Sequence, residues 1–253
     1  MAGAELYLFS SGTLGLQGIE VPVPFYLIRH LRGNVLVDGG NPLAVARDAH
    51  AHWGALADVF TVHMSEEQHC GAQLSRLGIA PEAIGWIVQT HLHIDHAGAL
   101  GHFPAARVLV HAAELESART IEHALAHGYV RADYEQPELD WQPFEGDLDL
   151  FGDGAVMLLQ TPGHSAGHVS LLLELEQTGS VLLTADAVDN RAQWEGSQSP
   201  RALHSADEAA RSRERLRGIA RELASSPQGE PLLVFGHDPE NWSRLEHAPE
   251  HYH

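Results

Sequence analysis

The sequence predicts an α+β fold, a four-layer αββα sandwich in which two β-sheets pack face to face and helices cover the outer faces. The order of the expected elements predicts it: a strand-rich part, a mixed part, a second strand-rich part, and a final helix and strand. Two similar halves of this kind suit two packed sheets. Because no short-period repeat or low-complexity linker divides the chain, residues 1–253 are expected to form a single domain.

The first half of the chain contains apolar runs typical of strands, and two helices. The expected strands lie at residues 5–10, 22–29, 33–40, 85–90 and 106–111. Gly33 is free to take a positive φ in the hairpin turn between the second and third of them. Ser65 and Gln68 resemble a capping box, which predicts a helix ending at Gly78, and a second helix is expected over residues 112–127.

The second half repeats this theme after an irregular stretch. Residues 128–146 are polar, aromatic and proline-bearing, and are expected to form a long surface loop. The expected strands that follow lie at residues 156–161, 168–175, 180–186 and 231–238. Ser205 with Glu208 indicates the start of a helix over residues 206–224.

Composition excludes several classes of partner. The 34 acidic and 15 basic residues give a formal charge of −19, and a field of that sign repels nucleic acid and anionic membranes. No apolar run approaches the roughly 18–20 residues that cross a bilayer, and the N-terminus has no signal-peptide pattern. Cys70 is the only cysteine, so no intrachain disulfide can form. These features predict a cytoplasmic protein.

Four of the expected strands run directly into side chains that bind metal ions. These side chains are His91, His93, Asp95, His96, His164, Asp186 and His237. Residues just past strand ends gather at one edge of a sheet sandwich, where seven imidazoles and carboxylates would repel one another or lack partners. Five histidines and two carboxylates without a thiolate suit two zinc ions, with one carboxylate bridging. Iron, cobalt and manganese are other divalent metals that these ligands accept.

Each of these residues also has a purely structural interpretation when it is taken alone. His93 alone would more often be an ordinary core or surface histidine, and Asp186 at a strand end would usually be a turn or cap residue. The joint pattern favours the metal site. Two metal ions about 3.5–4 Å apart hold a hydroxide at neutral pH and polarise a carbonyl, so hydrolysis is the expected reaction.

The segment "THLHIDHAG" resembles the HxHxDH motif of the metallo-β-lactamase superfamily. "TPGHSAGH", "TADAV" and "FGHD" follow in the superfamily's order, with gaps of 68, 22 and 51 residues between successive ligand positions, and "VLVDGG" resembles its aspartate-glycine strand end. The resemblance implies that one metal ion is held by His91, His93 and His164, and the other by Asp95, His96 and His237, with Asp186 bridging. It places Asp38 behind a ligand imidazole as a hydrogen-bond acceptor; an ordinary strand-end turn is the alternative for Asp38.

Within the superfamily, "HLHIDHAG" and "PVPFYLIRHLRGNVLVDGG" look most like the N-acyl-homoserine lactone lactonases, which are quorum-quenching enzymes. The resemblance implies a dizinc hydrolase that opens the lactone ring of this small-molecule substrate by attack of a metal-bridging hydroxide. Asp95 would pass a proton to the leaving group. Ile94 would offer an apolar contact to the substrate, and a simple core position is its alternative. Dimers and monomers both occur among such lactonases.

One position departs from the lactonase pattern. The family commonly has a tyrosine three residues after the bridging aspartate, and its hydroxyl assists the carbonyl oxygen; this chain has Asp189 there. An ionised carboxylate cannot donate that hydrogen bond. Either Tyr129 or Tyr134 from the long loop replaces the tyrosine, or the metal alone stabilises the oxyanion.

Other functions of the same fold stay open. A glyoxalase-II-like thioesterase, or another lactone or ester hydrolase, would share the metal motif. The thioesterase should have basic residues for its anionic substrate, and few arginines lie near the motifs. An iron-bearing oxygenase or electron-transfer module is a further alternative, as is a non-catalytic zinc-stabilised binding protein. A β-lactamase is disfavoured, because such enzymes are exported and no signal is seen.

Overall fold

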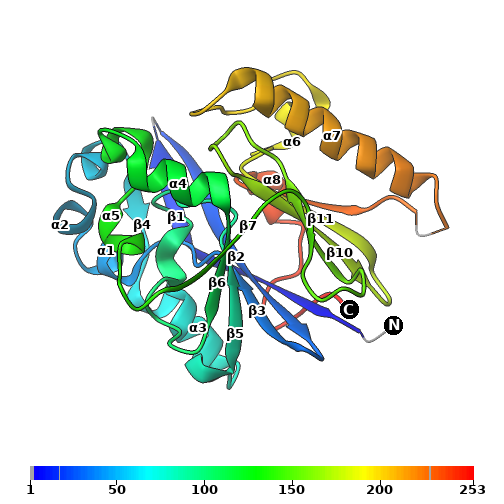
Figure 1. The fold of residues 1–253 in the computed structure, drawn as a ribbon, viewed down its shortest axis with the longest axis horizontal. Coiled ribbons are helices and arrows are strands. Elements are labelled where there is room, and N and C mark those ends of the chain that lie inside the picture. The colour runs from blue at the N-terminus through cyan, green and yellow to red at the C-terminus, as the bar shows by residue number, and fades with distance from the viewer. Residues whose placement is uncertain (1–2, 17, 228) are drawn as a thin grey trace.

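The computed structural model, which describes residues 3–16, 18–227 and 229–253, contains two β-sheets packed face to face with helices on their outer sides (Figure 1). This arrangement confirms the predicted αββα sandwich. The two ends of the chain lie close together in Figure 1, and the backbone of Leu6 in the first strand exchanges hydrogen bonds with Tyr252.

The first sheet has seven strands in the order β4-β1-β2-β3-β5-β6-β7. Their bounds are Glu5–Leu16 (β1), Ile19–His30 (β2), Gly33–Val37 (β3), Thr61–His63 (β4), Ile84–Val88 (β5), Arg107–His111 (β6) and Asp140–Phe144 (β7). The pairs β1/β2, β1/β4 and β2/β3 are antiparallel, whereas β3, β5, β6 and β7 run parallel. The carboxyl ends of β3 and β5 therefore meet at one edge, which brings Asp38 beside the segment that starts at His91.

The second sheet has five strands in the order β12-β11-β10-β9-β8. Their bounds are Leu148–Asp149 (β8), Val156–Gln160 (β9), Val169–Leu175 (β10), Gly179–Ala185 (β11) and Leu232–Phe235 (β12). Because β10 is antiparallel to both β9 and β11, and β12 is parallel to β11, the strands β9, β11 and β12 point the same way. Their carboxyl ends lead to His164, Asp186 and His237.

The helices lie outside the two sheets. Their bounds are Leu43–Arg47 (α1), Ala49–Trp53 (α2), Cys70–Arg76 (α3), Ala112–Thr120 (α4), Arg131–Tyr134 (α5), Arg191–Glu195 (α6), Ala206–Ala224 (α7) and Pro239–Trp242 (α8). Short 3-10 turns lie at Gly54–Asp58, Glu66–Gln68, Pro81–Ala83, Ala97–Ala99 and Ala124–His127. In Figure 1, α1 to α5 cover one side of the molecule and α7 the other. None of the helices in the described residues has the length and apolar character that crossing a membrane requires.

Alternating side chains of the strands form separate hydrophobic cores. In β1, Leu6 and Leu8 point between the sheets and pack in one cluster with Leu171 of β10, while Tyr7 and Phe9 point to the helices on the outer face. A third cluster joins the outer face of the second sheet to Leu216 of α7, and a fourth includes Ile94 in the loop after β5. Burying each such leucine contributes roughly 1.5–3 kcal/mol, which makes the sandwich a rigid support for its edge loops.

Two of the expected helices differ from the structure. The helix expected up to Gly78 divides into a 3-10 turn and α3, because the side chain of His69 accepts a hydrogen bond from Gly71 N and caps a new helix. The helix expected over 112–127 ends at Thr120, and His123 has a left-handed φ of 53° before the next 3-10 turn. Ser205 caps α7 as predicted.

The expected loop 128–146 was the least accurate prediction, because it contains α5 and the strand β7. Strand β7 pairs with β6 at the edge of the first sheet, where Pro143 is tolerated because one side of the strand needs no partner. An edge strand of polar and aromatic residues lacks the apolar alternation by which strands are recognised in a sequence.

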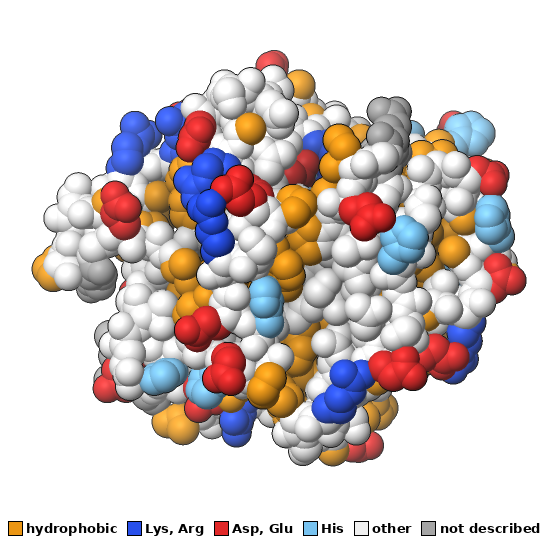
Figure 2. Space-filling model, turned by 180° about the vertical axis from the view of Figure 1, so that it is seen from behind, with side chains coloured by type: hydrophobic (Ala, Val, Ile, Leu, Met, Phe, Trp, Pro, Cys, Tyr) orange, Lys and Arg blue, Asp and Glu red, His pale blue; other side chains and the backbone are white. Residues whose placement is uncertain are grey.

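The acidic excess of the composition is spread over the surface in Figure 2. That face, opposite to the one in Figure 1, has acidic and arginine side chains interspersed, with hydrophobic side chains gathered in a band down its middle. Cys70 is a free, fully buried thiol. Burial raises the pKa of Cys70 to about 12, so this thiol stays protonated at neutral pH.

Candidate metal centre

The structure brings together all seven side chains that the sequence singled out as metal ligands. They come from both sheets: four follow β5, and the others follow β9, β11 and β12. All seven are buried. Their ligand-type atoms form overlapping groups, within each of which the atoms lie within 4.8 Å of one another. The carboxyl ends of strands from two packed sheets thus meet at one junction, as expected.

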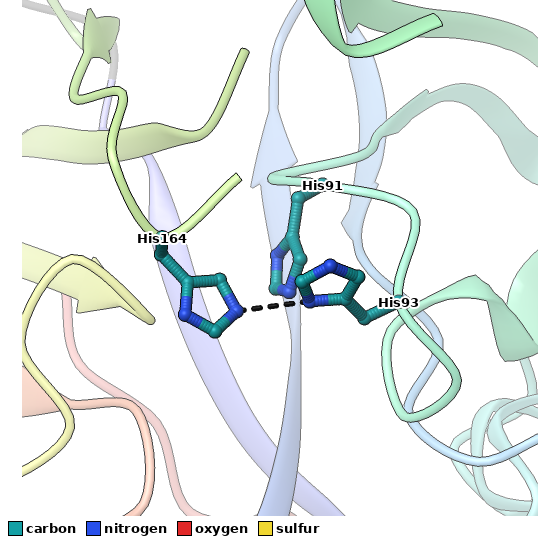
Figure 3. Close-up of side chains that lie close together, drawn as sticks. All are labelled: His91, His93 and His164. Carbon is teal, nitrogen blue, oxygen red and sulfur yellow. Dashed lines mark hydrogen bonds between the residues drawn. The ribbon is translucent and has the colours of Figure 1, made fainter. Parts of the chain in front are cut away.

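One group consists of His91, His93 and His164 (Figure 3). His91 and His93 extend from the loop after β5, and His164 reaches across from the loop after β9. The Nδ1 atom of His93 lies 2.9 Å from Nε2 of His164. Three imidazoles from two sheets therefore converge on one point.

A second group consists of Asp95, His96 and His237. The Nε2 atom of His237 lies 3.5 Å from Oδ2 of Asp95, and Nε2 of His96 lies 3.7 Å from Oδ1 of the same carboxylate. This group has the composition expected for a second metal ion, two imidazoles and one carboxylate.

Asp186 lies between the two groups and turns one oxygen toward each. Its Oδ2 is 3.2 Å from Nε2 of His164 and 3.9 Å from Nε2 of His91. Its Oδ1 is 3.3 Å from Nε2 of His96 and 3.3 Å from Nε2 of His237. A carboxylate placed in this way has the geometry of a bridge.

Buried atoms without hydrogen-bond partners show that this donor set fits metal ions. Among the described residues, Nε2 of His91, His96 and His237 and Oδ1 of Asp186 are buried with no hydrogen-bond partner. Each such atom costs roughly 1–3 kcal/mol when it is left unsatisfied, and here four of them face one another. Imidazole nitrogens and carboxylate oxygens without a thiolate are the ligands of zinc and of related divalent metals.

The electrostatics of the site divide the histidines into two kinds. Burial lowers the pKa of His93 to about 3 and holds the pKa values of His91 and His164 well below normal, so these imidazoles are neutral. Burial also disfavours the charged form of His237, but the charge of Asp186 outweighs it and raises the pKa to about 9. Only an unprotonated imidazole binds a metal ion, so metal binding at His237 releases a proton and weakens as the pH falls.

Asp186 itself is held in the ionised form. Burial alone would raise its pKa, but the neighbouring positive charges, with His237 first and His96 second, outweigh burial and keep the pKa well below the usual value. A carboxylate that is charged across the neutral pH range can share its two oxygens between cations.

Four of the five imidazoles are oriented by hydrogen bonds at Nδ1, on the side of the ring away from the centre. Nδ1 of His237 lies 2.9 Å from the carbonyl oxygen of Pro22, and Nδ1 of His164 lies 3.2 Å from that of Arg201. Nδ1 of His91 lies 3.0 Å from Oγ1 of Thr90. An acceptor at Nδ1 places the proton there, which leaves Nε2 free to face the centre.

Asp38 is the acceptor for the fourth ring. Its Oδ2 accepts a hydrogen bond from Nδ1 of His96 at 2.9 Å, which confirms the prediction that Asp38 lies behind one of these imidazoles. The same carboxylate accepts from the backbone N and Oγ1 of Thr90, both at 2.8 Å, and so also steadies His91. Close packing holds this turn: a Cβ atom on Gly39 would lie 2.0 Å from Ala99 N.

Sequence reasoning missed Glu114, a fully buried carboxylate on α4. Its Oε1 accepts hydrogen bonds from Leu92 N at 3.0 Å and from the Tyr129 hydroxyl at 3.1 Å. Its Oε2 accepts from Ser165 Oγ at 2.6 Å and from Gly167 N at 3.0 Å. Glu114 therefore joins the loop that carries His91 and His93 to the loop that carries His164.

His168, the first residue of the strand expected over residues 168–175, positions Asp186. Its Nε2 accepts a hydrogen bond from the backbone N of Asp186 at 3.0 Å, and its Nδ1 donates to Thr161 Oγ1 at 2.9 Å. Burial lowers the pKa of His168 to about 4, so the ring stays neutral and keeps this pair of bonds. The second Gly-His pair in "TPGHSAGH" was the sequence feature that could have identified His168.

The structure corrects two expectations about residues around Asp189. Tyr129 donates its hydroxyl to Glu114, and Tyr134 donates its hydroxyl to the carbonyl oxygen of Ala118 at 2.8 Å, so neither replaces the missing tyrosine. Arginine is also nearer than the sequence suggested, because the guanidinium of Arg201 contacts Asp186 and Asp189.

A cavity of about 210 Å³ opens beside the second group of ligands. Asp95, His237, Asp189, Asn190 and Arg201 form its polar wall, and Leu14, Ile19, Val21 and Phe60 its apolar wall. Ile94 is 4 % exposed and packs in a cluster with Leu14, Trp53 and Val130. Substrate contact by Ile94 stays a prediction.

The fold and the site define a metal-dependent hydrolase class, and the chain belongs to the metallo-β-lactamase superfamily, whose family model matches residues 18–237. The chain is 38 % identical over 268 residues to the N-acyl homoserine lactonase AttM of Rhizobium johnstonii, with each chain covered completely. It is 33 % identical over 234 residues to an N-acyl homoserine lactonase of Bacillus cereus, covering 92 % of this chain and 88 % of the other.

A solved structure similar to this chain is an N-acyl homoserine lactone hydrolase with the product N-hexanoyl-L-homoserine bound at its catalytic metal centre. The TM-score is 0.88 at 30 % identity, over 99 % of this chain and all of that one. The resemblance to the lactonases and the prediction of a metal-dependent hydrolase with this fold are thus confirmed.

Glu114→Gln is expected to weaken metal binding by about 10- to 100-fold, because an amide nitrogen would face donors where the carboxylate accepts four hydrogen bonds. Competition with a chelator measures the affinity. Glu116→Gln, an exposed position on the same helix, is the matched control. Wild-type metal affinity in Glu114→Gln would show that the two loops hold their positions without it.

Proposed function

We propose that this chain is a dizinc hydrolase that opens the lactone ring of N-acyl-homoserine lactones, and that residues 1–253 act as one catalytic unit. The main observation behind this proposal is the position of Asp186, whose two oxygens face two separate groups of ligands. Relatives at 38 % and 33 % identity named as N-acyl homoserine lactonases support the choice of substrate.

The residues present fit two divalent metal ions. His91, His93 and His164 would hold one, and the second would be held by Asp95, His96 and His237, with Asp186 shared. Bound there, a pair of zinc ions supplies a hydroxide nucleophile at neutral pH and polarises the carbonyl to be attacked.

Asp95 is the residue best placed to move a proton. Its carboxylate lines the cavity and reaches toward His237 at 3.5 Å. In the proposed reaction water adds to the lactone carbonyl carbon, the ring C–O bond breaks, and the ring oxygen leaves as an alkoxide that needs a proton. Asp95 accepts a proton from the adding water and delivers it to the ring oxygen as the bond breaks. The product is a carboxylate with a free hydroxyl, and one proton is released per turnover.

Apolar surface beside the site suits a substrate with an acyl tail. Phe60 lines the 210 Å³ cavity and also a larger, mostly apolar cavity of about 730 Å³. The larger cavity includes Leu56, Val59 and Leu203, of which Val59 and Leu203 are 53 % and 51 % exposed. When a hydrocarbon chain covers such surface, the binding free energy becomes more favourable by about 25 cal/mol per Å² of apolar surface removed from water.

A thioesterase is the second candidate, because Arg201 places a positive charge at the cavity. That charge is paired with Asp189, and the walls next to it are apolar, which favours a neutral lactone over an anionic thioester.

A pH-stat assay across N-acyl-homoserine lactones, acyl thioesters and β-lactams tests the substrate. Zinc-loaded protein is expected to release one acid equivalent per lactone, and to hydrolyse long-chain lactones with a higher kcat/KM than γ-butyrolactone because of the apolar cavity. Turnover of a thioester with no rate on any lactone would overturn the proposal.

Asp186→Asn is expected to lower the metal content below the two ions per chain expected for the wild type, and to slow lactone hydrolysis by at least about 100-fold. The amide is neutral and can no longer share two anionic oxygens between the ligand groups. Elemental analysis after gel filtration measures the metal. Asp207→Asn, at an exposed residue of α7, is the control. Two retained ions at the wild-type rate would refute the bridging role.

A further inference from the structure

Arg201 is a charged side chain at the centre that the ligand set does not use. Its Nε lies 3.2 Å from Oδ2 of Asp189, its Nη2 lies 3.4 Å from Oδ1 of the same carboxylate, and Nη2 also contacts Oδ2 of Asp186. The guanidinium thus forms a side-on, two-point pair with Asp189. The side chain of Arg201 is 41 % exposed, whereas those of Asp186 and Asp189 are 1 % and 12 % exposed.

The backbone around Arg201 is fixed to the same turn that carries His164. The carbonyl oxygen of Arg201 accepts from Nδ1 of His164 at 3.2 Å, and Leu203 N donates to the carbonyl oxygen of His164 at 3.1 Å. Ser205 N donates to the carbonyl oxygen of Gly163 at 3.0 Å. The segment is therefore held against the centre by its main chain.

Asp189 is fixed as well. Its backbone N donates to Oε1 of Gln193 at 2.8 Å, and Nε2 of Gln193 donates to Oδ2 of Asp189 at 3.1 Å. Both oxygens of Asp189 are thus used inside the protein, one by Arg201 alone and the other by Arg201 and Gln193. Asp189 therefore holds the guanidinium of Arg201 in place.

The remaining nitrogen of the guanidinium has no partner among the described side chains around it, so it is free to bind a ligand. Among the described residues, the contacts of Arg201 go through Nε and Nη2, and Nη1 makes no hydrogen bond or ion pair. Arg201 lines the 210 Å³ cavity together with Asp95 and His237. Arg201 therefore brings to this cavity a side chain that is 41 % exposed and carries two N–H groups with no partner among the described residues.

We propose that Arg201 is a substrate-binding residue, and that Asp189 is the positioning residue that holds it. This inference rests on the proposed lactonase function. Nη1 donates to an acyl oxygen of the lactone and, after ring opening, to the carboxylate of the product. A donor is thereby supplied beside Asp189, where the lactonase resemblance implies a tyrosine, since the carboxylate, which cannot donate, orients a cation that can.

The chemistry of ring opening fits a permanent cation at this place. The lactone is neutral and its product is an anion, so the hydrogen bond from Arg201 becomes charge-assisted on both sides as the reaction proceeds. Interactions that strengthen as charge develops on the acyl oxygens accelerate the reaction, whereas equal binding of the substrate and the transition state does not raise kcat. Loss of Arg201 should therefore lower kcat as well as product affinity.

The test uses zinc-loaded wild-type protein and the variants Arg201→Ala, Arg201→Lys and Asp189→Asn. Titration calorimetry with the ring-opened product N-hexanoyl-homoserine gives Kd, the pH-stat assay gives kcat and KM, and elemental analysis gives the metal content. The control is Arg32→Ala, which makes the same change of charge. Arg32 lies just before the start of β3, at the end of the sheet opposite to the metal centre.

Arg201→Ala is expected to bind the product about 10- to 100-fold more weakly than the wild type and to lower kcat, with the metal content unchanged. Arg201→Lys should have a product affinity and a kcat between those of the wild type and of Arg201→Ala, because a lysine ammonium cannot form the side-on pair and donate to the substrate at once. Asp189→Asn should weaken product binding by less than Arg201→Ala. Arg32→Ala should match the wild type.

Two results would overturn the inference. Unchanged product affinity and kcat in Arg201→Ala would show that the guanidinium does not touch the substrate. Loss of metal from both Arg201→Ala and Arg201→Lys would show that it only supports the ligands. Failure of the wild type to turn over any lactone would instead overturn the proposed function, so the two failures are distinguishable.

Discussion

Between two groups of imidazoles, the buried carboxylate of Asp186 turns one oxygen to His164 and the other to His96 and His237. The negative charge of Asp186 is stable in the interior because positive charge surrounds it. The buried imidazole nitrogens that face Asp186 are stable because they point toward the same metal centre. Neither part could be buried alone without a large desolvation cost. The surrounding loops are therefore arranged so that the carboxylate and the imidazoles are buried together.

The sandwich makes this junction possible, and a layer of hydrogen bonds holds it in place. Strands β5, β9, β11 and β12 end at one edge, so residues distant in sequence meet there. Asp38, Glu114 and His168 then fix the loops: the first orients His96, the second joins two loops, and the third holds the backbone of Asp186. Each acts through another residue, which is why a site described by its ligands alone would be incomplete.

The ligands could be predicted from sequence because they follow recognisable strands and four of them lie within residues 91–96. Asp38 was assigned its role behind a ligand imidazole by the family resemblance of "VLVDGG". Glu114 could not be predicted, because nothing local separates it from the exposed Glu116 two residues later. Arg201 lies on a loop whose path is set by main-chain bonds to His164, and such contacts have no periodic signature. Strand β7 was missed because edge strands need no apolar alternation.

The central claim is that two metal ions lie on either side of Asp186. A crystal structure of zinc-loaded protein, with anomalous scattering recorded on both sides of the zinc absorption edge, tests it most directly. The account predicts two anomalous peaks, one among His91, His93 and His164 and one among Asp95, His96 and His237, each bonded to a different oxygen of Asp186. A single peak, or peaks bound by other residues, would contradict it.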